Sequence, residues 1–209
     1  DVAGITTSYA FNENVGVTAF WARIFNDNST STTNRNANYM DNMDAVGLTV
    51  PLTFDGVSIT PWGMYAGIGP AINYNSVTGT QITTYTSTAS AGGPRAGLLP
   101  LYGGFHKKRL TEYGNAMWVG LPGQVTTFDP FRISWDVVYG AVQYDDSAMN
   151  RAGWLASLLL EYKLDWSTPG LYGWYTSGDD DNLGNGSERM PNIHPNNPND
   201  FSEFAFHGD

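Results

Sequence analysis

Residues 153–177, GWLASLLLEYKLDWSTPGLYGWYTS, contain two runs of extended-chain character separated by a turn. In an extended chain successive side chains point to opposite faces, so Ser157, Glu161 and Lys163 fall on one face of the first run. The other face is apolar and holds Trp154, Ala156, Leu158, Leu160, Tyr162 and Leu164. Because Ser-Thr-Pro-Gly at 167–170 is typical of a turn, the stretch predicts a β-hairpin.

Three further stretches, at residues 2–25, 46–68 and 113–139, repeat this plan. Their turns are expected at Asn12-Glu13-Asn14, Asp55-Gly56 and Asp129-Pro130. Asp-Gly between two alternating runs is a strong hairpin signal. Pro61 cannot donate to a strand ladder, so we expect a bulge or a register change there.

Tight turns alternate with longer polar connections along the chain, at residues 26–42, 69–112 and 178–200. Bacterial outer-membrane barrels have short periplasmic turns, longer extracellular loops and strands with an apolar outer face. The sequence therefore predicts an all-β fold, a transmembrane antiparallel up-and-down β-barrel of porin type. The pattern contains eight or nine strands, and we expect residues 1–209 to form a single β-barrel unit or a fragment of one.

Composition narrows the function classes. Aromatic residues make up 14% of the chain and charged residues only 14%, with 24 glycines, which suits strands and turns. No apolar run is long enough for a transmembrane helix. Cysteine is absent, so a disulfide scaffold, a thiolate metal site and a Cys nucleophile are excluded. Ten basic residues against twenty acidic ones, a net charge of −10, argue against nucleic acid as a partner.

Aromatic residues recur near the ends of the expected strands, where the interfacial girdles of a membrane barrel lie. They are Tyr9, Phe11, Trp21, Phe54, Phe128, Phe131, Tyr162, Trp166, Tyr172 and Trp174. Residues 201–206, FSEFAF, are expected to open a further strand.

Six blocks of sequence carry a family resemblance: ITTSYAFNENVGVTAFWAR, DAVGLTVPLTFDGVSITPWGMYA, LTEYGNAMWVG, FDPFRISWDVVYG, RAGWLASLLLEYKLDWSTPGLYGWYTSGDDDN and GSERMP. In these blocks the chain resembles the homotrimeric porins of the outer membrane of sulfate-reducing bacteria. The resemblance implies a passive diffusion channel for small hydrophilic solutes and ions, in a Gram-negative outer membrane, with the lipid bilayer and two further copies as partners and no cofactor. Such porins are longer and end on an aromatic-terminated strand, whereas this chain ends in FAFHGD. A porin needs more than eight or nine strands for an aqueous channel, so the resemblance implies that residues 1–209 cover about half of a larger barrel.

Five residues are candidates for the pore lining, because alternation places them on the polar face of their strands. They are Arg132, Asp136, Ser157, Glu161 and Lys163. In one interpretation their charges select among solutes; in the other they form ion pairs along the wall.

The 69–112 segment is too long for an ordinary connection and is the candidate for a constriction loop folded into the lumen. Its basic residues are Arg95, His106, Lys107, Lys108 and Arg109. Facing acidic residues across a pore, they would create a transverse field. The alternative is a solvated tip on the extracellular side.

The acidic residues also allow two other interpretations, a metal site and a catalytic site. Asp179, Asp180, Asp181 and Glu188 offer oxygen ligands for Ca²⁺, although the order does not match an EF-hand and surface acidity is the alternative. His106, His194 and His207 show no metal-ligand spacing, so no metal site is assigned.

Asp136 and Glu161 also resemble the carboxylate pair of a β-sandwich glycosidase. No Ser–His–Asp order, phosphate loop or zinc motif accompanies them, and we do not expect an enzyme. The alternatives to a porin are a closed structural or adhesive outer-membrane barrel without conductance, and a soluble carbohydrate-binding β-sandwich.

Overall fold

The computed structural model describes residues 3–26, 42–69, 96–98, 112–145, 147–180, 182 and 185–193. These residues form a single antiparallel sheet of eleven strands, accompanied by the short 3-10 helices η2 (Ala96–Leu98) and η3 (Ser147–Met149). The predicted all-β, antiparallel class is confirmed.

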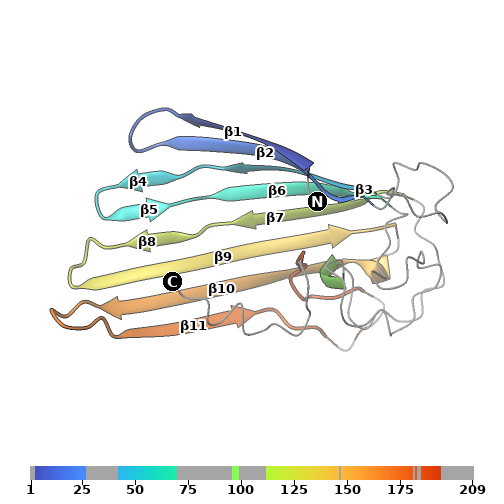
Figure 1. Ribbon diagram of the computed structural model, residues 1–209. Helices are drawn as coiled ribbons and strands as arrows, with labels where there is room; N and C mark the ends of the chain where they lie inside the picture. Colours follow the sequence, from blue (N-terminus) through green and yellow to red (C-terminus); the bar gives the residue numbers. More distant parts are fainter. Residues whose placement is uncertain are drawn as a thin grey trace.

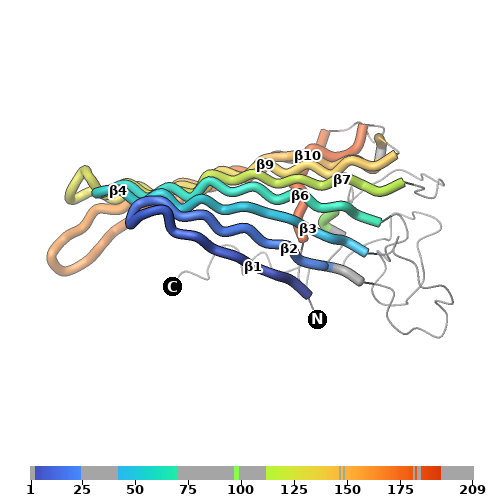
Figure 2. The backbone as a smooth tube through the Cα atoms, turned by 90° about the horizontal axis from the view of Figure 1, so that it is seen from above, coloured from blue at the N-terminus to red at the C-terminus, as the bar shows by residue number. Residues whose placement is uncertain are grey.

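The chain runs back and forth across the sheet, and each traverse, called a pass, lies beside the pass before it (Figures 1 and 2). A pass consists of one strand or of two consecutive strands in line. They are β1 (Ala3–Ala10), β2 (Gly16–Asn26), β3 (Asn42–Thr49), β4 (Leu52–Phe54), β5 (Val57–Ile59), β6 (Trp62–Ile68), β7 (Gly114–Gly120), β8 (Gly123–Val125), β9 (Phe131–Gln143), β10 (Arg151–Tyr162) and β11 (Gly170–Thr176). This is the up-and-down connectivity expected from the hairpin pattern. In the described residues the sheet is open, with β1 and β11 as its edges.

Eleven strands replace the eight or nine that the sequence predicts because proline interrupts three of the passes. Pro51, Pro61 and Pro122 lie in the gaps between β3 and β4, β5 and β6, and β7 and β8. Each proline lacks the N–H that would complete the ladder. Its carbonyl still accepts a bond from the neighbouring strand: Gly16 N–H donates to Pro51, Val50 N–H to Pro61 and Thr60 N–H to Pro122, at 2.9–3.1 Å.

The bulge or register change predicted at Pro61 is wrong. Trp62 pairs with Gly120 and Ile59 with Gly123, which is the same register on both sides of the proline. A register shift occurs instead in β2, between Arg23 and Phe25. The proline therefore breaks one hydrogen bond without changing which face each residue occupies.

All four predicted hairpin turns lie at one end of the sheet, the turn end, at residues 11–15, 55–56, 126–130 and 163–169 (Figure 1). The opposite end of the sheet is called the loop end. A longer connection is expected there after every hairpin, and this expectation is wrong in one case. Residues 144–150 join β9 to β10 in no more residues than the 163–169 turn uses.

The turns are staggered: each reaches further than the one before it (Figure 1). Residues that pair side by side across neighbouring strands form a row. Val15, at the first turn, lies in the same row as Trp135 of β9. The second hairpin extends to the row of Ile133, and the third extends to the row of Phe131. Since two passes separate successive turns, the stagger is about one residue per strand. With a rise of about 3.4 Å per residue and about 4.8 Å between strands, it corresponds to strands inclined by about 35°.

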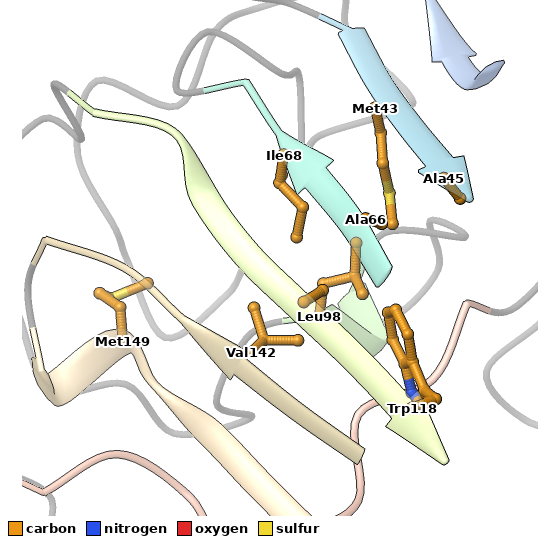
Figure 3. Packing of buried hydrophobic residues seen from close by; sticks show 9 residues of the cluster. Met43, Ala45, Ala66, Ile68, Leu98, Trp118, Val142 and Met149 are labelled. Atoms are coloured by element: carbon orange, nitrogen blue, oxygen red, sulfur yellow. The ribbon is translucent and has the colours of Figure 1, made fainter. Parts of the chain in front are cut away.

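The apolar core lies on one face of the sheet at the loop end (Figure 3). Leu98 of η2 and Met149 of η3 pack there against residues of the strands. Across the core, the indole N–H of Trp118 donates to the carbonyl of Pro191 at 2.8 Å. The strand residues of the core are Met43, Ala45, Ala66, Ile68, Ala116, Trp118 and Val142.

Gly140 is predicted to be indispensable to this packing. A Cβ there would lie 2.7 Å from Cδ1 of Trp118 and 3.0 Å from Cγ of Pro191. We expect Gly140→Ala to lower the free energy of unfolding by about 1–3 kcal/mol, the usual range for overpacking. Urea unfolding followed by tryptophan fluorescence measures this loss. Gly173→Ala, where a Cβ meets nothing within 4 Å, is the matched control; equal stability of the two variants would contradict the packing argument.

Candidate functional site

The two faces of the sheet differ in composition over its whole width. The outer face is defined as the one carrying Trp21, Val46 and Tyr65, and the inner face as the one carrying the core. Pairing keeps residues of the same face in common cross-strand rows. One outer row contains Trp21, Val46, Tyr65, Met117, Ala141 and Ala152.

The outer face is apolar and is not covered by other described residues. Ile5 on β1 is 70% exposed and Leu171 on β11 is 71% exposed, so the exposed apolar surface extends to both edges of the sheet. Large exposed apolar surfaces are rare on soluble monomers and mark contact with a partner or a membrane. Other exposed members are Tyr9, Val46, Leu48, Phe54, Tyr65, Met117, Val119, Phe131, Trp154, Leu158, Leu160 and Tyr175.

A polar row ends the apolar surface at the loop end. Arg23 lies opposite Asp44, and its guanidinium forms two bonds to the carboxylate, at 2.9 and 3.0 Å. The row continues through Gly67 to Asn115 and Gln143. Among the described strands, Arg23 and Asp44 are the charged residues of the outer face, and they are paired at its boundary.

The apolar band has a definite height. On β9 it extends from Phe131 to Ala141, which at about 3.4 Å per residue is about 34 Å along the strand. With the inclination of about 35° obtained from the stagger, the height across the band is about 28 Å. The apolar band of an outer-membrane barrel is about 25 Å tall.

Four of the aromatic residues predicted as girdles, Tyr9, Phe54, Phe131 and Tyr162, occupy outer-face positions at the turn end. The rings of Tyr9 and Phe11 meet edge to face with centroids 5.0 Å apart, as do those of Phe131 and Tyr162. The prediction is wrong for Tyr172 and Trp174. Pairing places them opposite Leu159 and Ser157, on the inner face, because the outer positions of β11 are 171, 173 and 175.

The inner face becomes more polar toward the turn end, although Leu159 and Tyr172 also lie there. Four of the five predicted pore-lining residues are there. The guanidinium of Arg132 forms an ion pair with the carboxylate of Glu161 directly opposite on β10. Asp136 lies opposite Ser157. Lys163 lies just beyond β10, and its backbone N–H donates to the carbonyl of Pro130 at 2.8 Å.

Residues 185–193 fold back over the loop end of the inner face. Arg151, only 7% exposed, donates from Nε to the carbonyl of Arg189 at 3.0 Å and from Nη2 to that of Met190 at 2.9 Å. Ser187 forms a parallel bridge with Arg151. This segment and η2 meet where Asn192 N–H donates to the carbonyl of Gly97 at 3.0 Å.

Sequence reasoning missed Arg151 and Trp118 as residues that position this covering segment. The parity of their strands places both on the inner face, and that signal was available. Their partners are carbonyl groups of residues 189–191, distant in sequence, which no local pattern identifies.

Other predicted site residues lie outside the described residues: Arg95, His106, Lys107, Lys108, Arg109 and Asp181. Of the acidic group, Asp179 accepts a bond from the N–H of Glu188 at 3.3 Å. Within the described ranges no three His, Cys, Asp or Glu residues are grouped as for a metal ion. No helix in the described part of the chain is both long and apolar enough to cross a membrane.

Comparison with protein-family models, curated proteins and solved structures found no match for this chain.

Arg151 is predicted to hold residues 185–193 on the sheet. In Arg151→Met the bonds to two carbonyls are lost, and bonds to a charged donor contribute about 1.5–3 kcal/mol each. We expect amide hydrogen exchange at Ser187 and Ala152, which donate to the carbonyls of Asn150 and Ser187, to accelerate at least tenfold. Arg132→Met removes a cation from the same face and should leave both amides protected. Unchanged exchange in Arg151→Met would refute the role.

Proposed function

We propose that this chain forms part of the wall of an outer-membrane porin, through which small hydrophilic solutes and ions diffuse passively. The apolar outer face carries the proposal. No described residue covers it, it reaches both edges of the sheet, it has its charged pair at one boundary, and it is about as tall as the hydrocarbon core. Lipid is the environment in which such a face is stable.

The strand arrangement supports a closed barrel as the complete form. Lipid cannot bond to free backbone groups at a sheet edge, so a sheet in a membrane must close. An inclination of about 35° agrees with that of barrel strands, and an even number of passes leaves the two edges running antiparallel to each other. Further strands added to these edges would continue the alternation of strand direction around the barrel.

The alternatives agree less well with the geometry. A soluble sandwich packs the apolar face of one sheet against another, and here the covered face is the inner one, at the loop end. A catalytic carboxylate pair needs groups within about 10 Å. Asp136 and Glu161 lie in rows whose backbones are about 14 Å apart, and Glu161 is paired with Arg132.

A cation added to the outer face is predicted to prevent stable insertion. Leu158 lies near the middle of the apolar band, and an Arg at the midplane of a barrel costs about 2–4 kcal/mol. Leu158→Arg should lower the folded yield in vesicles, measured by resistance to protease and by electrophoretic mobility without heating. Ser157→Arg, the adjacent residue on the inner face, is the matched control. Equal yields for both variants would argue against lipid contact.

Conductance tests the pore itself. The full-length protein, reconstituted in a planar bilayer, is expected to produce discrete conductance steps that scale with salt concentration, because a water-filled lumen admits ions. A silent bilayer despite verified insertion would contradict the porin proposal and favour a closed structural or adhesive barrel. A protein that stays monomeric and folded without detergent would favour the soluble sandwich.

A further inference from the structure

At the inner positions of the described strands, one charged group is left uncompensated. The inner positions of the described strands hold four charged residues: Arg132, Asp136, Arg151 and Glu161. Arg132 and Glu161 neutralise each other in an ion pair. Arg151 is buried beneath residues 185–193, with its guanidinium bonded to carbonyl oxygens. Asp136 remains as the uncompensated charge at these strand positions, and Lys163 lies beyond the end of β10, at the turn end.

Asp136 is half-buried, and its Oδ1 is shielded from solvent without a hydrogen-bond partner among the described residues. A carboxylate in this position is costly unless a positive charge approaches it. No basic side chain lies in the neighbouring inner positions of its row or of the next row toward the turn end. Those positions hold Ser157, Trp174, Ser134, Gln124, Leu159 and Tyr172.

The neighbouring groups suit a hydrated cation. Ser157 lies directly opposite Asp136, and Ser134 is the next inner residue on the same strand. Ser134 in turn lies opposite Gln124 of β8. Hydroxyl and amide oxygens beside a carboxylate are the ligands that hard cations and their water shells prefer.

We propose that Asp136 is the residue that makes this pore prefer cations, by attracting hydrated monovalent cations as they pass the wall. The inference rests on the proposed porin function. A unit charge acting across about 5 Å of water changes the local concentration of a monovalent ion by about fourfold, in opposite directions for cations and anions. The selectivity therefore comes from the strand wall near the middle of the inner face.

The test is the K⁺/Cl⁻ permeability ratio, obtained from the reversal potential of the full-length protein in a planar bilayer under a KCl gradient at pH 7. We expect the wild-type ratio to exceed one and Asp136→Asn to reduce it about fourfold or more. Asp136→Glu should retain the wild-type ratio. Asp55→Asn makes the same chemical change in an exposed turn, away from the inner face, and should leave the ratio unaltered.

The outcomes separate the two proposals. Conductance in wild type together with a ratio unchanged in Asp136→Asn would overturn the role of Asp136 and leave the porin intact. A wild type that inserts but does not conduct would overturn the porin proposal. Conductance steps in Asp136→Asn also establish that the variant has folded, so an altered ratio is not the result of a lost barrel.

Discussion

The hydrogen-bond register between strands is the constraint on which the other features depend. Because the side-chain period of a strand is two, a slip of one residue would move every side chain of that strand to the opposite face. Apart from the shift near Arg23, the pairing keeps one register from β2 to β9, so each apolar row continues across the sheet. An uninterrupted apolar outer face and a polar inner region are both consequences of that continuity.

The prolines show how the register survives local defects. Pro51, Pro61 and Pro122 lie in three neighbouring passes, and each removes one donor from the ladder. Their carbonyls remain bonded to adjacent strands, so the chain continues on both sides without inserting an extra residue. The same unshifted pairing preserves the stagger of the turns, from which the inclination of the strands follows.

The faces of most strands were predictable from sequence because large apolar and small polar residues alternate, as around Asp136 in β9. Prediction failed where the pattern was ambiguous or the contact was nonlocal. In LYGWYTS aromatic residues occupy both parities, so Tyr172 and Trp174 could not be assigned to a face without the pairing to β10. The bonds from Arg151 to residues 189 and 190 join distant segments, and no periodicity encodes them.

The two halves of the inner face differ in their cover and charge, and under the proposed porin function this difference limits where selectivity can arise. At the loop end, Trp118 and Arg151 hold a covering segment over an apolar core, and the charge of Arg151 is buried beneath that segment. Toward the turn end the inner strand positions are more polar, and no described segment covers their charged residues. Since Arg132 is paired with Glu161 there, we infer from the proposed function that the field at the described inner strand positions is governed by the carboxylate of Asp136, which is held on β9.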